Sequence, residues 1–141
     1  MSMSTGLERP AHRPPPTHRA AARCAVLVAA VLVRLSPHRI DAVLRLLRRG
    51  SRPATRNRAR AARDAVVQVS VRCAGQGCLQ RSVATVLLCR LTGAWPTWCT
   101  GVRTEPFRAH AWVEAEGAPV GERDDIRLFH VVLTVPHRDP V

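Results

Sequence analysis

The sequence predicts an α+β fold in which helices come first and an antiparallel sheet follows. Through residues 19–72 and 78–91, apolar side chains recur at the three- and four-residue spacing of helices. From residue 95 to residue 135, short alternating stretches are separated by turns, which is the pattern of a strand meander. A chain of 141 residues suits a single domain with one modest core.

The composition divides the chain into a short tail and one domain. Residues 1–18 are rich in Pro, Arg, His and Ser, so we expect them to be disordered. Residues 19–141 are expected to form one domain, with a helical part at 19–72 and a core that carries the chemistry at 73–135. No internal repeat is visible.

The first predicted helix runs from about Ala20 to Leu35 and is apolar on nearly every side. This pattern predicts that the helix is buried. The run Cys24–Val33 resembles the apolar part of a signal peptide, but Arg34 closes it with no small-residue cleavage site. Ten residues are also too few to span a bilayer. We therefore expect a buried helix and no membrane contact.

Two further helices are marked by their ends. Ser36 is a candidate cap, Pro37 occupies a first turn, and Gly50 follows the predicted end of that second helix. A third helix is expected after Thr55. Residues 66–71 alternate like a strand, but we expect the helix to continue through them.

The second half of the chain begins with a glycine-broken loop. Gly75 and Gly77 interrupt the periodicity, and the next apolar helix starts at Cys78 and ends before Gly93. Strands are expected afterwards at 95–102, 109–114, near Val120, and at 126–135.

Charge is distributed very unevenly. All 22 basic residues are arginine; residues 1–63 hold 14 of them against two acids, whereas residues 64–141 hold eight arginines and eight acids. A basic segment of this kind can bind nucleic acid, an anionic lipid surface or an acidic protein. It can also be a solvated helix face in a chain with arginine-biased composition.

The cysteine content favours reduced thiols. Five cysteines without a CxxC pair do not form an even disulfide framework, which predicts a cytoplasmic protein. A zinc site from Cys73, Cys78, Cys99 and His110 lacks the usual ligand spacing, so we expect no metal. Four cysteines are expected to be packing residues: Cys24, Cys73, Cys89 and Cys99.

Cys78 is the candidate nucleophile because it stands where the glycine loop meets a helix. Unpaired N–H groups and the dipole at a helix start favour a thiolate, which is the reactive form of cysteine. The backbone N–H groups of Cys78 and Leu79 are candidate donors to an oxyanion.

His110 is the candidate base. It lies on an alternating strand and shares a face with Trp112 and Glu114. A catalytic imidazole needs an acceptor on its second nitrogen, and Glu122 is the expected carboxylate. Asp124 and Asp125 are the alternatives for that position.

Four blocks of the sequence carry a resemblance to a known family. The blocks are Gly77-Cys-Leu-Gln-Arg-Ser82, Trp95-Pro-Thr-Trp-Cys-Thr-Gly-Val-Arg103, Pro106-Phe-Arg-Ala-His-Ala-Trp-Val-Glu114 and Pro119-Val-Gly-Glu122. Together they resemble the leader peptidases of lasso-peptide biosynthesis. The resemblance covers roughly residues 24–135 and is strongest over 73–122.

The resemblance implies a transglutaminase-like, papain-like cysteine protease that uses no cofactor. Its substrate would be the leader region of a ribosomally made precursor peptide, and it would depend on a small, separate leader-binding protein. The freed core amine would pass to an ATP-dependent, asparagine-synthetase-like cyclase. By position, Cys78 matches the nucleophile and His110 the base, while Glu122 stands where this family commonly has Asp.

Two other functions stay open at this point. One is a non-catalytic basic adaptor that binds nucleic acid or anionic surfaces through residues 19–63, whereas the peptidase needs no nucleic acid. The other is an acyltransferase that uses the same triad, because a transglutaminase-like fold hosts both reactions.

Overall fold

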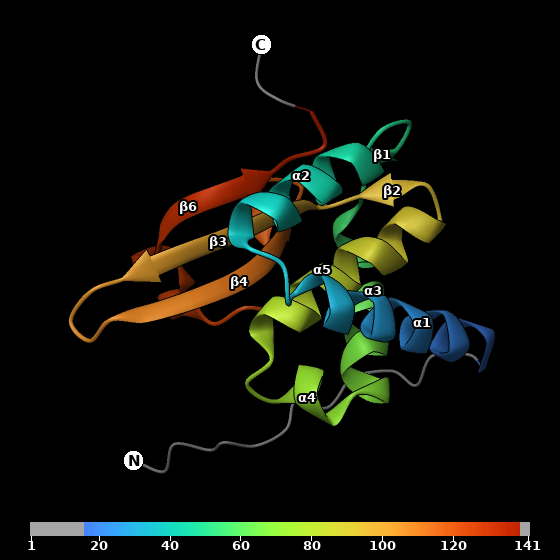
Figure 1. The fold of residues 1–141 in the computed structure, drawn as a ribbon, viewed down its shortest axis with the longest axis horizontal. Coiled ribbons are helices and arrows are strands. Elements are labelled where there is room, and N and C mark those ends of the chain that lie inside the picture. Colours follow the sequence, from blue (N-terminus) through green and yellow to red (C-terminus); the bar gives the residue numbers. More distant parts are fainter. Residues whose placement is uncertain (1–15, 139–141) are drawn as a thin grey trace.

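A three-helix layer forms one side of the protein. The structure, a computed structural model, describes residues 16–138. Helices α1 (Pro16–Leu32), α3 (Arg56–Val69) and α5 (Cys78–Leu91) pack against one another, with α5 contacting the sheet (Figure 1). This arrangement places the first residue of α5 close to the strands.

The other side is a four-stranded antiparallel sheet in the order β5-β4-β3-β6. Its strands are β3 (Thr97–Arg103), β4 (Arg108–Ala115), β5 (Ala118–Pro119) and β6 (His130–Val135). Because β5 pairs only with the last residues of β4, the earlier part of that edge is left facing α5. The predicted α+β class, with helices first and an antiparallel sheet afterwards, is confirmed.

Shorter elements join the two layers. Helix α2 (Pro37–Leu47) contacts β6, and the one-turn helix α4 (Val71–Ala74) precedes the loop that leads into α5. Strands β1 (Arg52–Pro53) and β2 (Ala94–Trp95) form a separate parallel pair.

Most helix ends follow the residues that predicted them. Pro37 stands in the first turn of α2, and the Thr55 hydroxyl accepts a hydrogen bond from the Arg58 N–H at the start of α3. The third helix does continue beyond residue 66, but it ends at Val69, and the Ser70 side chain then caps α4. The expected tail, 1–18, falls mostly outside the described residues, although α1 already begins at Pro16.

Two predicted strands are partly wrong. Residues 95–102 were expected to form one strand, whereas Trp95 ends β2 and a separate strand, β3, begins at Thr97. Residues 126–135 were expected to form a single strand, whereas the structure has the 3₁₀-helix η1 (Asp124–Leu128) followed by β6. Asp124 and Asp125 stand in the first turn of η1, where carboxylates are favoured. This turn brings Phe129 back toward the sheet.

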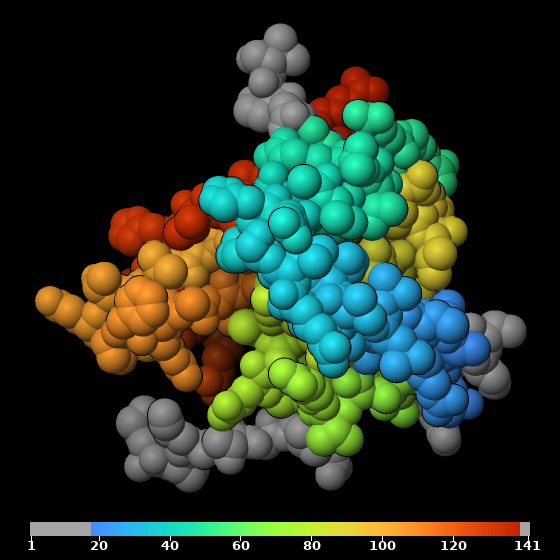
Figure 2. Space-filling view, in the orientation of Figure 1, coloured from blue at the N-terminus to red at the C-terminus, as the bar shows by residue number. Residues whose placement is uncertain are grey.

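The expectation that α1 is buried all round is also wrong. Its alanines at 22, 25 and 29 face the core, whereas Leu27, Val28 and Val31 are 68%, 50% and 65% exposed. Cys24, expected to be a packing residue, is exposed as well. The physical reason is that α1 lies outermost and contacts α3 and α5 through one side only (Figure 2). No helix in the described part of the chain has the length and apolar character needed to cross a membrane.

Buried tryptophans connect β2 with β6 and the sheet with α5. Trp95, Trp98 and Trp112 are all buried, as expected for core residues. The Trp98 indole N–H donates to the Ser82 hydroxyl of α5 at 3.1 Å, and the Trp95 N–H donates to the Val135 carbonyl at 3.1 Å. Buried indoles with satisfied N–H groups fix both position and orientation. The distance between the start of α5 and β4 is therefore set by the core.

Gly101 allows the sheet to close beside the candidate site. It is the register partner of His110, and a Cβ added there would lie 2.6 Å from the His130 carbonyl oxygen and 2.9 Å from the Trp112 ring. Only a residue without a side chain fits this space.

We predict that Gly101→Ala lowers the free energy of unfolding by roughly 1–3 kcal/mol, because backbone and a buried ring would have to move. Urea denaturation followed by tryptophan fluorescence measures this. The control is Thr104→Ala in the exposed turn between β3 and β4. An unchanged denaturation midpoint for Gly101→Ala would contradict the close approach.

Candidate active site

The loop between α4 and α5 delivers Cys78 to the start of a helix. Gly77 is the residue before the helix, and a Cβ there would lie 2.7 Å from the Arg72 carbonyl oxygen. Cys78 is the first residue of α5 and is half-buried, as its sequence position predicted. The thiol therefore stands at the end of a helix where N–H groups favour negative charge.

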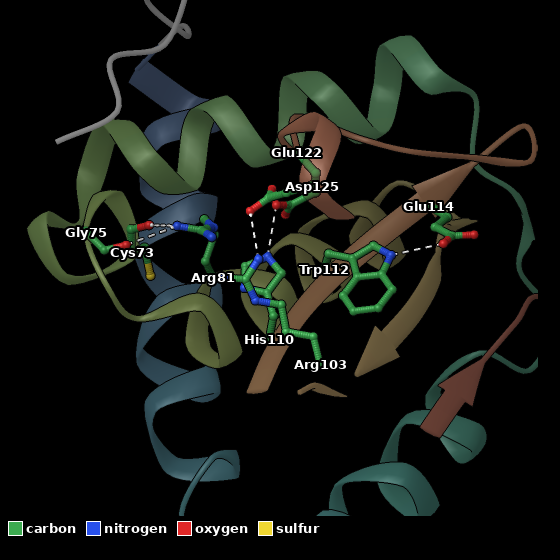
Figure 3. A network of polar contacts seen from close by, with 9 residues as sticks. All are labelled: Cys73, Gly75, Arg81, Arg103, His110, Trp112, Glu114, Glu122 and Asp125. Carbon is green, nitrogen blue, oxygen red and sulfur yellow. Dashed lines mark hydrogen bonds and ion pairs between the residues drawn. The ribbon is translucent and has the colours of Figure 1, made fainter. Parts of the chain in front are cut away.

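His110 and Glu122 join this thiol in one cluster. The His110 Nε2 lies 2.9 Å from a carboxylate oxygen of Glu122 (Figure 3). The second ring nitrogen is left for the Cys78 thiol, and the two groups are close enough for each to shift the pKa of the other. The structure thus brings together three residues that are 32 and 12 positions apart in the sequence.

The neighbouring carboxylates, on Asp124, Asp125 and Glu114, do not contact His110. Asp125 pairs with Arg103 at 3.7 Å, Asp124 is exposed, and Glu114 accepts a hydrogen bond from the Trp112 indole N–H at 2.9 Å. In Figure 3, Glu114 lies on the far side of Trp112 from the imidazole. Glu122, which is 9% exposed, is the carboxylate that meets His110.

The thiol and the imidazole each change the ionisation of the other. Burial raises the pKa of Cys78, but the hydrogen bonds from His110 and the Ala111 N–H, with the charges of His110 and Arg81, outweigh it and bring the pKa below its ordinary value. Burial lowers the pKa of His110, but its hydrogen bonds to Cys78 and Glu122 and their negative charges raise it to about 9. Both shifts favour transfer of the thiol proton to the imidazole, which is the direction that produces a thiolate–imidazolium pair.

The other cysteines lack this environment. Burial raises the pKa of the Cys89 and Cys99 thiols to about 12, and it also raises the pKa of Cys73. Cys99 contacts the Thr134 hydroxyl on the neighbouring strand. Within the described residues, no group of three or more His, Cys, Asp and Glu side chains is placed to hold a metal ion.

The expected pair of oxyanion donors needs one correction. The Cys78 N–H donates to the Gln76 carbonyl at 2.9 Å, because the loop turns sharply before the helix, so that donor is already used. The Leu79 N–H lies in the first turn of α5, where amides have no helical acceptor. The backbone of Ala111 on β4, which the sequence analysis missed, helps to lower the pKa of the Cys78 thiol.

Arg81 is a second residue that the sequence analysis missed. It stands one turn after Cys78, is 6% exposed, and donates from Nη1 to the carbonyls of Cys73 at 3.0 Å and Gly75 at 3.2 Å (Figure 3). It therefore holds the loop that carries the nucleophile and places a positive charge near the thiol. The sequence signal was a charged residue near the start of a mostly apolar helix.

Aromatic rings cover the imidazole. The Trp112 ring is stacked with His110 at 5.9 Å, and the Phe129 ring lies 5.6 Å away on another side. The Arg103 guanidinium lies over Phe129 at 5.7 Å. These contacts restrict rotation of the imidazole.

An open cleft leads to the thiol. It has a volume of about 650 Å³ and lies between the loop before α5, the start of β4 and the segment that contains η1. Figure 2 shows it as a hollow between the green residues near 75 and the orange hairpin, with dark red residues behind. Its lining is Ala74, Gly75, Gln76, Cys78, Arg81, Arg108, Ala109, His110, Glu122, Arg123, Asp125, Ile126 and Phe129.

We predict that Arg81→Met slows alkylation of Cys78 by iodoacetamide at neutral pH by roughly 10- to 100-fold, because the loop shifts and a charge near the thiolate is lost. Its rate–pH midpoint should also rise. Arg81→Lys should lie between wild type and Arg81→Met, since it keeps the charge but not the planar fork.

Arg90→Met is the matched control. Arg90 donates to the carbonyls of Leu47 and Arg49 from the far end of the same helix. The Arg90→Met variant therefore loses a similar pair of hydrogen bonds to backbone carbonyls, but leaves the loop before Cys78 unchanged. Equal alkylation profiles for Arg81→Met and Arg90→Met would contradict a specific role for Arg81.

Comparison with known proteins agrees with this geometry. The family model described as the transglutaminase-like superfamily matches residues 22–134. Neither the curated proteins nor the solved structures gave a match. This superfamily includes cysteine peptidases and acyltransferases. This match covers most of the chain and includes the cysteine that begins α5 and the histidine on β4. The protein therefore belongs to the transglutaminase-like superfamily.

Proposed function

We propose that this protein is a cysteine peptidase that removes the leader from a lasso-peptide precursor. The observation that carries the proposal is the contact of the Cys78 thiol with His110, whose other nitrogen meets Glu122 at 2.9 Å. A lowered thiol pKa and a raised imidazole pKa are what a cysteine nucleophile with a histidine partner requires. The four sequence blocks around these residues resemble the leader peptidases, and they supply the choice of substrate.

In the proposed mechanism, the Cys78 thiolate attacks the carbonyl carbon at the junction of leader and core. The carbonyl oxygen becomes an oxyanion, with the Leu79 N–H as a donor. Protonated His110 then gives its proton to the nitrogen of the core, the C–N bond breaks, and the leader remains as a thioester on Cys78.

Water completes the proposed cycle. His110, now neutral, takes a proton from water, the resulting hydroxide attacks the thioester, and the leader leaves as a carboxylic acid. The sulfur departs as thiolate, which restores the ion pair with His110. Glu122 keeps the imidazole oriented throughout and stabilises its protonated form.

The partners in this proposal come from the resemblance. A small leader-binding protein would present the precursor, and an ATP-dependent, asparagine-synthetase-like cyclase would use the freed amine in the cytoplasm. The arginine-rich first part of the chain, with 14 arginines against two acids in residues 1–63, suits an acidic leader or an acidic partner. No bound cofactor is part of the mechanism.

Acyl transfer is the second candidate, and the superfamily match favours it equally because both reactions share the thioester. In that case an amine would attack the thioester in place of water. A non-catalytic adaptor that binds nucleic acid or anionic surfaces is the third, and it is supported by the arginines alone.

The test uses a precursor peptide encoded beside this gene, mixed with the protein and the neighbouring small leader-binding protein. We predict one cut between leader and core, detected by mass spectrometry. Cys78→Ala and His110→Ala should each reduce the rate at least about 1,000-fold, because each removes a group that acts in bond cleavage. Cys24→Ala is the control, since it removes an exposed thiol far along the chain.

The outcomes separate the three functions. Full activity of Cys78→Ala would rule out the proposed nucleophile. Incorporation of an added amine at the cut in place of water would favour the acyltransferase. Salt-sensitive binding to polyanions by wild type and Cys78→Ala alike, without cleavage, would favour the adaptor.

A further inference from the structure

Two exposed arginines line the cleft, and a third stands beside one of them. Arg108 begins β4 and shares a strand face with His110, and Arg123 directly follows Glu122. Both line the cleft. Arg103 is the register partner of Arg108 on β3, so two like charges stand opposite each other across the strands. Such a pair is unfavourable unless a negative group lies nearby.

The carboxylates of the protein neutralise the charges of these three arginines only in part. Glu122 is paired with His110, and Asp125 meets Arg103 at the long distance of 3.7 Å. Among residues 16–138, no ion pair joins Arg108 or Arg123 to a carboxylate, and none is formed by Glu105 in the intervening turn.

One atom of Arg103 also lacks a hydrogen-bond partner. Its Nε is buried and has no hydrogen-bond acceptor in the described part of the chain. The Arg103 guanidinium lies over the Phe129 ring. The carboxylate that it meets is that of Asp125, at the long distance of 3.7 Å. Buried donors are nearly always satisfied, so the positive charge of Arg103 is left with little compensation from the protein.

We propose that Arg108 and Arg123, backed by Arg103, form a subsite for a carboxylate of the peptide substrate. The inference rests on the proposed function and specifies its substrate class: a peptide with an acidic side chain near the reacting bond. Arginine forks suit carboxylates, and the charges left over in this part of the cleft are all positive.

Strand geometry gives the position of that acid. Arg108 precedes His110 by two residues, which is about 7 Å along a strand. An extended peptide has nearly the same rise per residue. A substrate lying extended in the cleft beside β4 would therefore bring an acidic residue to Arg108 about two positions from the bond that is cut.

The test uses two electrophilic peptides that differ by one group. Chloroacetyl-Ala-Glu-amide and chloroacetyl-Ala-Gln-amide both alkylate a thiolate: sulfur attacks the methylene carbon, and chloride leaves. We expect Cys78 in the wild type to react roughly 3- to 10-fold faster with the Glu probe, and this preference should fall as salt rises. Mass spectrometry of the labelled protein identifies the site of alkylation.

The variant that removes the subsite is Arg108→Gln/Arg123→Gln. Both side chains are exposed, so the fold should be kept, and circular dichroism checks this. We expect equal rates with the two probes. The control, Arg34→Gln/Arg39→Gln, loses the same charge from exposed positions outside the cleft lining and should keep the preference.

Equal rates with both probes in the wild type, or a preference that survives in Arg108→Gln/Arg123→Gln, would overturn the subsite. Absence of alkylation at Cys78 by either probe would instead contradict the proposed nucleophile. In that case, binding of Ala-Glu and Ala-Gln peptides carrying a neutral fluorophore to Cys78→Ala, followed by anisotropy, decides the subsite. No preference for the Glu peptide there would overturn it.

Discussion

The rest of the structure depends on the contact between the first residue of α5 and the middle of β4. Separating charge between a thiol and an imidazole is costly in a half-buried place unless hydrogen bonds compensate for the lost water. Here the compensation comes from three directions: the Ala111 N–H on the strand, Glu122 on the segment after β5, and the start of the helix. Each direction depends on a different element, so the pair forms only when helix layer and sheet are docked.

That docking is built from large apolar side chains rather than from the polar groups themselves. Trp98 is fully buried between the layers and donates to Ser82, one turn beyond Cys78. Arg81 fixes the other side of the nucleophile by holding two carbonyls of the preceding loop. The thiol is therefore held by a rigid helix start, and the imidazole is held between Trp112 and Phe129. Such preorganisation is what electrostatic catalysis requires.

Local signals explain why much of the site was predictable. Gly75 and Gly77 interrupt the helical periodicity, so the helix start at Cys78 could be placed to the residue. Strand alternation put His110 and Trp112 on one face, and they are indeed stacked. These features depend only on neighbours in the chain.

Features that depend on contacts between distant segments were not predictable in the same way. Alternation could not distinguish Glu122 from Asp124 and Asp125, since that choice depends on the turn into η1. The Ala111 N–H has no side-chain signal at all. The use of the Cys78 N–H by Gln76 depends on the exact turn of the loop. Likewise, an apolar α1 sequence does not reveal that only one side of the helix finds a partner.

The most direct test of the account is a titration of the Cys78 thiolate by its ultraviolet absorbance, taken as the difference between wild type and Cys78→Ala. The account predicts a thiolate midpoint below the ordinary cysteine value of 9.0, because His110 and Ala111 stabilise the anion. In His110→Ala that midpoint should move upward, because burial raises the pKa of the thiol and the imidazole that opposes this effect is lost. A wild-type midpoint at or above 9.0, or one that is unchanged in His110→Ala, would contradict the thiolate–imidazolium pair on which the proposed function depends.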